Sequence, residues 1–173
     1  MSRITLPTVE TMTAAQRRAV DEIVAGKRGR APQPFLAWLR SPELASRAQR
    51  LGEFVRYETS LTGRLSELAI LVVARWWASE YEWTIHRAEA LKAGLAENVI
   101  DAIARQQPPP FDRADEAAVY EFSTSVCETR TVSDAIYQRA VDAVGEQGVV
   151  ELVGLLGYYT LISMTLNVFD LHS

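Results

Sequence analysis

The hydrophobic and polar positions of residues 66–94 repeat with the period of an α-helix, but they leave two polar faces instead of one. At about 100° per residue, the first polar stripe covers roughly a third of the helix circumference. It consists of Glu67, Arg75, Ser79, Glu82 and His86. The second polar face lies on another side and consists of Ser66, Glu80, Thr84 and Arg87. One face suffices to meet water, so the first stripe is predicted to line a cavity. This wheel treats the helix as straight, although residues 76–78 interrupt the apolar pattern and a bend would fall there.

The remaining segments also show helical periodicity, and no block of alternating residues indicates a sheet. The predicted fold class is all-α: one compact multi-helix domain over residues 1–173, with a long central helix at about 65–93 that ends at Gly94. Thr13, Ser41 and Ser133 are predicted N-caps, and Gly26 and Gly145 are predicted stops. Further helices are predicted at about 14–25, 35–39, 42–57, 97–105, 114–128, 133–144 and 147–168.

The amino-acid composition and net charge limit the kinds of binding partner that are expected for this chain. The chain has 173 residues, 48% hydrophobic content and a formal net charge of −4, so no general attraction to nucleic acid or to anionic membranes is expected. The basic cluster at 27–30 is interpreted as a solvated loop. The first ten residues lack the apolar core of a signal peptide, which makes the cytoplasm the expected location.

Residues 148–169 are apolar over a length that could span a bilayer. Glu151 and Asn167 interrupt this run, and no Lys or Arg cluster flanks it to fix a topology. A helix that is apolar all round is also typical of a protein core or of a subunit interface. The favoured interpretation is a buried helix, and no membrane association is expected.

Glu82 and His86 are four residues apart, so their side chains are neighbours on one helical face. A carboxylate beside an imidazole fixes its tautomer and raises its basicity, which makes His86 a candidate general acid or base. Glu67 is the second candidate acid–base group. Arg75 could hold a substrate carboxylate, and Ser79 could donate to an oxyanion, although an ion pair and a passive small residue are the plainer roles.

Other side chains are assigned with less specificity. Trp83 is a candidate substrate-binding residue, but packing in the core or at an interface is the commoner role for Trp76, Trp77 and Trp83. Cys127 is the single cysteine, so an intramolecular disulfide is impossible and a small buried hydrophobe is the favoured interpretation. No cofactor and no metal site are predicted, although His86, Glu82 and Glu67 could supply three ligands on paper. His172 is expected to be exposed.

The run ELAILVVARWWASEYEWTIHRAEALKAGL (67–95) resembles the carboxymuconolactone decarboxylase and alkyl hydroperoxidase D superfamily. The flanking runs at 40–64 and 93–103 resemble it as well. Peroxidase members carry a CxxC pair, and the matching positions here are Ser79 and Glu82. A serine hydroxyl cannot cycle through sulfenic acid and a disulfide, so disulfide-based peroxidase activity is not expected.

The resemblance implies an alkyl hydroperoxidase D-like helical fold and a homo-oligomer, either a trimer or a hexamer. It also implies a cofactor-free acid–base enzyme that decarboxylates, isomerises or otherwise rearranges a small organic acid or lactone. His86 would move the proton, with Glu82 and Glu67 orienting it. The alternatives are a non-catalytic small-molecule binder or scaffold and, more weakly, residual peroxidase activity through Cys127. A cavity at His86 would separate the enzyme from the scaffold.

Overall fold

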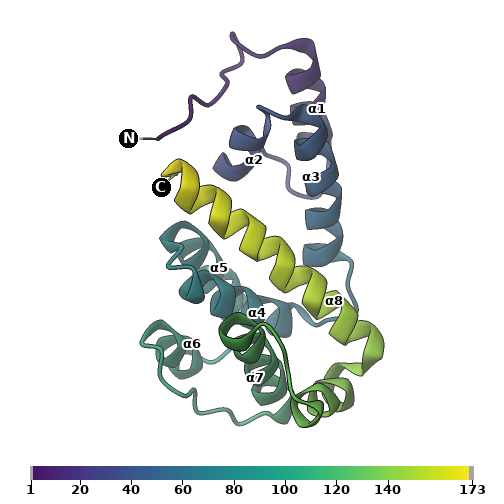
Figure 1. Cartoon of the computed structure of the whole chain (residues 1–173), viewed down its shortest axis with the longest axis vertical. Helices are drawn as coiled ribbons and strands as arrows, with labels where there is room; N and C mark the ends of the chain where they lie inside the picture. The colour runs from purple at the N-terminus through teal and green to yellow at the C-terminus, as the bar shows by residue number, and fades with distance from the viewer. Residues whose placement is uncertain (1, 172–173) are drawn as a thin grey trace.

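The computed structural model describes residues 2–171, and every regular element in that part of the chain is an α-helix (Figure 1). The all-α prediction is confirmed. The predicted location of His172 lies outside the described residues. The helices are α1 (Ala14–Ala25), α2 (Gln33–Trp38), α3 (Pro42–Tyr57), α4 (Gly63–Trp76), α5 (Glu80–Lys92), α6 (Glu97–Ala104), α7 (Ala114–Thr129) and α8 (Asp134–Phe169).

Most helix ends follow local sequence signals. The Thr13 hydroxyl accepts a hydrogen bond from the Gln16 amide, while the Gln16 side chain accepts from the Thr13 amide, which forms a capping box. Ser133 caps α8 in the same way through the Ile136 amide. Ser41 occupies the N-cap position of α3 as predicted, with Pro42 at the first helical position, but the Ser41 side chain makes no capping hydrogen bond.

The predicted long helix at 65–93 is two helices. The chain leaves α4 at Trp77, and Ala78 adopts a left-handed φ of 48° that ends the helical path. The Ser79 amide then donates to the Ala74 carbonyl at 2.9 Å, and the Asn167 side chain caps the exposed Trp77 carbonyl at 2.7 Å. This turn falls at the interruption noted in the hydrophobic pattern, and α5 packs back against α4 as an αα-hairpin. The long helix of the molecule is α8, which bends at Gly145, where φ is 74°.

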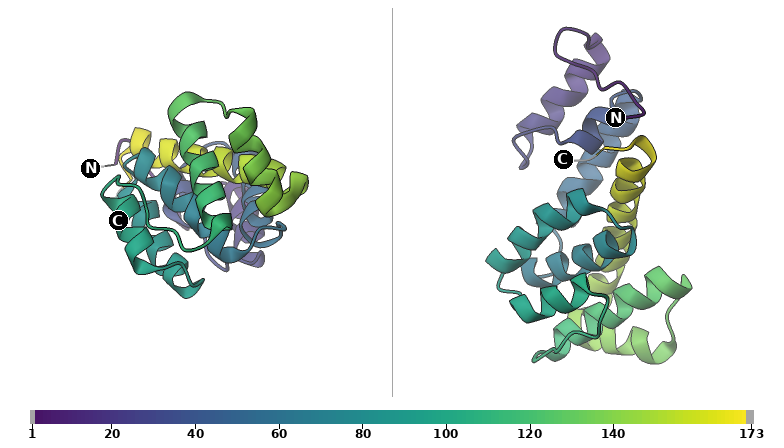
Figure 2. Two further views of the ribbon diagram at one scale, coloured as in Figure 1. Left: turned by 90° about the horizontal axis from the view of Figure 1, so that it is seen from below. Right: turned by 90° about the vertical axis from the view of Figure 1, so that its left-hand side faces the viewer.

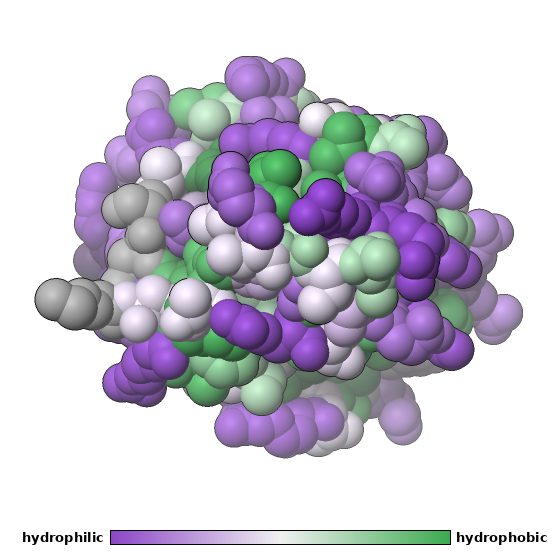
Figure 3. Space-filling view, turned by 90° about the horizontal axis from the view of Figure 1, so that it is seen from above, coloured by the Kyte–Doolittle hydropathy of each residue, from purple (hydrophilic) through white to green (hydrophobic). Residues whose placement is uncertain are grey.

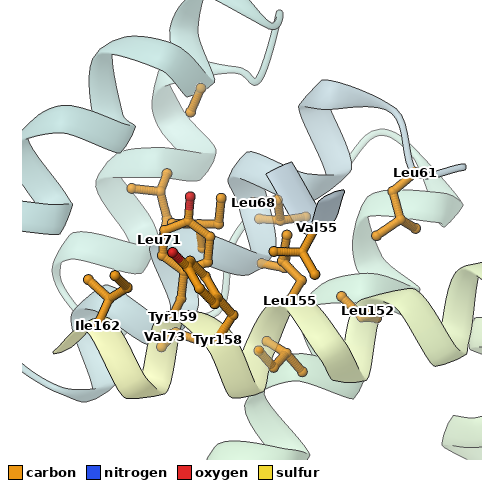
Figure 4. Close-up of a cluster of buried hydrophobic side chains, with 14 of the residues drawn as sticks. Val55, Leu61, Leu68, Leu71, Val73, Leu152, Leu155, Tyr158, Tyr159 and Ile162 are labelled. Carbon is orange, nitrogen blue, oxygen red and sulfur yellow. The ribbon is translucent and has the colours of Figure 1, made fainter. Parts of the chain in front are cut away.

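α8 crosses the molecule between two groups of helices (Figures 1 and 2). α2 and α3 pack on one side of it, and α4 and α7 pack on the other. Buried side chains from α3, α4 and α8 fill the space between them, among them Val55, Leu68, Leu71, Leu155 and Ile162 (Figure 4). Nearly every residue of α4 between Leu65 and Ala74 is buried, so it is the central helix of the core.

The C-terminal part of α8 is long and apolar enough to cross a membrane, yet about 61% of its most apolar window is buried within the protein. That burial is typical of a core helix, as predicted for 148–169. At the end of the molecule formed by the N-terminal helices, hydrophilic residues surround scattered hydrophobic patches (Figure 3).

Candidate active site

The α4–α5 hairpin brings three predicted site residues together. The His86 Nδ1 atom lies 2.6 Å from the Glu67 Oε2 atom, and the His86 Nε2 atom lies 3.3 Å from the Glu82 Oε2 atom. On a straight helix Glu67 and His86 would lie roughly 28 Å apart. They meet because the turn at 77–79 stands about midway between them in sequence. The structure therefore brings the three predicted residues together, but the straight-helix geometry used to group them is wrong.

Burial isolates this triad from bulk water. His86 is 1% exposed, and Glu67 and Glu82 are almost as deeply buried. The Tyr159 ring meets the imidazole edge to face, with 5.0 Å between ring centroids and an interplanar angle of 88°. This contact and the two carboxylates fix the plane of the imidazole. Glu67 stands behind the ring at Nδ1, which leaves Nε2 as the nitrogen that can exchange a proton with a ligand.

The charge state of His86 is set by two opposing effects. Burial of the imidazole acts to lower its pKa, but hydrogen bonds and charge attraction from Glu67 and Glu82 outweigh it, so the His86 pKa is raised above its ordinary 6.5. The position between two carboxylates therefore favours the protonated form of this imidazole relative to that of a histidine in water. Burial, with a smaller contribution from the charges of Glu82 and Glu67, raises the pKa of Tyr159 well above its ordinary range, and this tyrosine stays a neutral packing partner.

A cavity of about 160 Å³ opens onto His86 and Glu82. Its walls come from the loop before α2, from α2 and the end of α3, and from α5 and α8. Glu67 does not line it, which agrees with a role behind the imidazole. The ring-bearing wall residues are Phe35, Tyr57, Tyr81, Tyr158 and Tyr159.

Three arginines on the cavity wall escaped the sequence interpretation. Arg28 and Arg30 belong to the basic cluster assigned to a solvated loop, and Arg56 lies near the end of α3. The solvated-loop interpretation holds for the neighbouring Lys27, which pairs with Glu58 at the surface at 3.0 Å. Spacing along the chain gives no sign that 28 and 56 converge. The sequence offered only one signal for these wall residues: Arg28 and Arg56 each lie on a segment that precedes the predicted site helix.

Arg28 is held by packing against aromatic rings, and the Tyr158 hydroxyl is a polar group beside it. Its guanidinium carbon lies 4.9 Å from the Phe35 ring centroid and 6.0 Å from that of Tyr57. Its Nε and Nη2 atoms are buried, and no side chain or carbonyl among residues 2–171 accepts a hydrogen bond from them. Buried charge-bearing donors are costly to leave unpaired, so this guanidinium is suited to hold an anionic ligand group.

Arg56 adds a second positive charge at the same wall. Burial acts to lower its pKa, but electrostatic interaction with Tyr159, Tyr57, Glu67 and Glu82 outweighs that effect, so the pKa of Arg56 is raised. Its guanidinium carbon lies 5.3 Å from the Tyr57 ring centroid. Within residues 2–171 it forms no salt bridge. The Glu82 carboxylate, the His86 imidazole and these arginines therefore line one small cavity, with Glu67 behind the imidazole.

The predicted substrate-binding residues lie elsewhere. Arg75 is half-buried beside a different pocket on α4, α6 and α7, with Glu80 at 3.7 Å. Ser79 is buried as the residue before α5, and its hydroxyl finds no partner in the described chain. Trp83 is half-buried against the hydrophobic core, as the packing interpretation expected. Ser66, which the wheel placed on the solvated face, is buried. The wheel grouped Arg75 and Ser79 with the triad because it treated the helix as straight across the turn at Ala78, whereas Ser66 is buried because α4 is the central helix of the core.

Two further predictions concern thiol and metal chemistry. Cys127 is half-buried in a separate pocket, and burial raises its pKa to about 11, so the unreactive thiol form prevails at neutral pH. Searching residues 2–171 for three or more clustered His, Cys, Asp or Glu side chains with the arrangement of a metal site finds none. In the Glu67–His86–Glu82 triad both imidazole nitrogens already face carboxylate oxygens.

The site is a buried Glu–His–Glu triad beside an arginine-lined cavity in an all-helical fold. Comparison with known sequences shows which family this segment resembles. Residues 42–122 match the model of the carboxymuconolactone decarboxylase family. This segment, which carries the whole triad, is similar to that family, and the predicted resemblance is confirmed. At the two positions of the peroxidase CxxC pair the chain has Ser79 and Glu82. A search of curated proteins gives no match.

Solved structures support the same fold over nearly the full chain. One similar structure is that of a cysteine-to-alanine variant of the debrominase Bmp8 in complex with 2,3,4-tribromopyrrole. It is 13% identical in sequence, its TM-score is 0.76, and the match covers 98% of this chain and 92% of the other. At this identity the likeness concerns the fold alone.

Proposed function

We propose that the protein is a cofactor-free acid–base enzyme that acts on a small organic acid or lactone. The observation that carries the proposal is the opening of His86 and Glu82 onto a cavity whose opposite wall presents Arg28. An isolated structural Glu–His pair would have no reason to face a cavity together with a guanidinium held against aromatic rings. Membership of the carboxymuconolactone decarboxylase family supports the reaction class.

In this proposal the arginines bind and the triad moves the proton. The Arg28 and Arg56 guanidinium groups hold a substrate carboxylate and stabilise negative charge that develops beside it. Nε2 of His86 exchanges a proton with the substrate, with the Glu82 carboxylate as its neighbour on the cavity wall. Glu67 accepts the Nδ1–H bond, fixes the tautomer and stabilises the imidazolium, so it is a positioning residue.

The cavity counts against the scaffold alternative, because a homologue that had lost its site would be expected to close it with apolar side chains. The peroxidase alternative has little support, since Cys127 is held as a thiol in a pocket that shares no residue with the cavity. The similar debrominase structure does not support a thiol-dependent reaction in this protein either, because Cys127 lies outside the cavity. If peroxide consumption survived Cys127→Ser, that alternative would be excluded.

Carbon acids that exchange hydrogen with solvent provide the direct test. The purified protein is incubated in D₂O with small carboxylic acids and lactones, and deuterium incorporation and conversion are followed by NMR and mass spectrometry. We expect exchange or turnover with at least one compound and a loss of roughly 10²–10⁴-fold in His86→Gln. Arg75→Gln is the matched control and keeps full activity.

Two results would contradict the proposal. Full activity of His86→Gln would show that the imidazole does not carry the proton. Saturable binding of an acid to the wild type without exchange or conversion of any compound would favour the non-catalytic binder.

A further inference from the structure

The Tyr158 hydroxyl is a buried hydrogen-bond donor on the wall of the His86 cavity, and the proposed proton transfer does not use it. Tyr158 is 2% exposed and lines the same cavity as His86. Within residues 2–171 no group accepts the proton of this hydroxyl. Buried tyrosine hydroxyls usually have a partner, because an unsatisfied donor costs stability. An acceptor supplied by a ligand would satisfy it.

Packing fixes the position of this hydroxyl. The Tyr158 ring projects from α8 beside that of Tyr159 (Figure 4). It meets the rings of Trp38 and Tyr159 edge to face, with centroid distances of 6.4 and 5.6 Å. A Cβ atom at Gly52 on α3 would overlap the Tyr158 hydroxyl oxygen. The absence of a side chain at Gly52 therefore leaves the space that the hydroxyl occupies.

Arg28 is a second donor beside this hydroxyl. A Cβ atom at Gly52 would also lie 2.9 Å from the Arg28 Nη2 atom, so the guanidinium and the hydroxyl lie against the same point of α3. A guanidinium has donors only, so it cannot accept the Tyr158 proton. Burial raises the pKa of Tyr158 well above its ordinary value of 10, so the phenol keeps that proton. The wall thus presents a neutral donor and a charged donor side by side.

The two carboxylates on the cavity wall have other partners. The Glu82 Oε2 atom lies 3.3 Å from the His86 Nε2 atom, and the Glu89 Oε1 atom accepts a hydrogen bond from the Lys92 Nζ atom at 2.8 Å. The acceptor that the two donors lack is therefore left for a ligand to supply. A ligand carboxylate has two oxygens, and each of them can accept from one donor.

We infer that Tyr158 is a specificity-determining residue whose hydroxyl donates to the same substrate carboxylate that Arg28 holds. This inference rests on the proposed function and states how that site recognises its acid. One carboxylate oxygen accepts from the Arg28 guanidinium, and the other accepts from the Tyr158 hydroxyl. A neutral analogue of the acid forgoes the charge-assisted bonds, so the pair of donors selects the acid.

The size of the cavity indicates which acid is a suitable probe. Its volume is about 160 Å³, and an apolar cavity of about 150 Å³ in another protein binds benzene. Aromatic side chains also form much of the wall. The acid is therefore about one ring in size, and benzoate is the probe. Nitrobenzene has nearly the same shape without the charge and is the neutral comparison.

The test is an NMR titration of the full chain with benzoate and with nitrobenzene. We expect Tyr158→Phe to weaken benzoate binding about 10-fold and to leave nitrobenzene binding unchanged, because only the carboxylate is a strong acceptor. Tyr137→Phe is the control, since it removes a hydroxyl from the same helix at a position that is 43% exposed. Equal weakening of both probes by Tyr158→Phe would assign the residue to packing and overturn the inference.

Two further measurements distinguish recognition from a structural role. If both donors hold one carboxylate, the double variant of Arg28→Ala and Tyr158→Phe should lose less affinity than the product of the single losses. Losses that multiply would overturn the shared carboxylate. Without ligand, Tyr158→Phe should unfold at the same urea concentration as the wild type or a higher one, because no internal hydrogen bond is lost. A lower midpoint would show that the hydroxyl serves the fold.

The results also separate this inference from the proposed function. If benzoate binds through both donors and no compound exchanges hydrogen, the catalytic proposal fails and the recognition by Tyr158 stands. If hydrogen exchange depends on His86 while Tyr158→Phe keeps full affinity for benzoate, the inference is wrong and the catalytic proposal stands. A wild type that does not bind benzoate would overturn the inference as well.

Discussion

Two small polar pockets flank the α4–α5 hairpin, and each holds an arginine with a buried nitrogen that no described residue bonds. The cavity at His86 has Arg28, and the pocket between α4, α6 and α7 has Arg75, with a volume of about 100 Å³. The Arg75 pocket also has a buried, unpartnered Thr124 hydroxyl and is lined by Glu128. Of the two pockets, only the His86 cavity is lined by an imidazole, whose pKa is raised by two glutamates, so only that cavity offers an acid–base group. Unpaired polar atoms alone do not distinguish a catalytic site from a solvated crevice.

The largest expected difference between the pockets is in anion affinity. Arg28→Ala should weaken binding of a benzoate probe by about 10- to 100-fold, because a charge-assisted hydrogen bond to a buried guanidinium contributes about 1.5–3 kcal/mol. Arg75→Ala should leave the dissociation constant unchanged. Titration of benzoate followed by NMR measures both. A larger loss in Arg75→Ala would move the binding site to the second pocket.

Next in size is the packing behind Arg28. A Cβ atom added at Gly52 would lie 2.1 Å from the Tyr158 hydroxyl oxygen and 2.9 Å from the Arg28 Nη2 atom. Gly52→Ala should therefore displace both cavity residues and lower the free energy of unfolding by about 1–3 kcal/mol, as overpacked cores do. Gly63→Ala is the control, since nothing lies within 4 Å of its added Cβ. Urea denaturation compares the two, and equal stability of both variants would show that Tyr158 moves freely.

A smaller effect concerns pH. The folded-state pKa of His86 lies above its unfolded value near 6.5, so the stabilisation it contributes is complete below that pH and is lost as pH rises through the folded pKa. Nitrogen-15 NMR of a His172→Asn chain, in which only His86 reports, should give a pKa above 6.5. Glu67→Gln should lower it, and Glu80→Gln on the exposed side of α5 should not. An unshifted pKa in Glu67→Gln would remove Glu67 from its positioning role.

The smallest expected effect concerns the turn that separates the two pockets. Ala78 is exposed with φ at 48°, a conformation that a side chain disfavours. Ala78→Gly should therefore stabilise the protein by about 0.5 kcal/mol, after the entropy gained by the unfolded chain is subtracted. Ala88→Gly, at an exposed position inside α5, should destabilise it by about 1 kcal/mol. Thermal denaturation gives both signs. Destabilisation by Ala78→Gly would mean that the methyl group stabilises the turn.

The sequence predicted the helices well because their signals are local. Caps at Thr13 and Ser133 and the stop at Gly145 depend on residues within a few positions, and the structure has all three. The turn at Ala78 was seen only as an interruption, because no glycine or proline marks it and an alanine in the left-handed region is uncommon. Missing that turn put Arg75 and Ser79 beside the triad on the wheel.

Chemistry was predictable where it depended on residue type and family pattern, as for Glu67, Glu82 and His86. The arginines at 28 and 56 were not, because they reach the cavity through the packing of α2 and α3 on α8. Such convergence depends on which helices meet, and a single sequence carries no local record of it. The candidate site was thus predicted in its acid–base half and missed in its binding half.

The two halves of the site have separate origins in the chain. The acid–base residues come from one hairpin of neighbouring helices, whereas Arg28, Arg30 and Arg56 come from segments that precede it. Substitutions in the early segments can therefore change which acid is selected without disturbing the contact between Glu67 and His86. In the proposed enzyme, the residues that recognise the substrate can therefore change while the residues that transfer the proton stay the same.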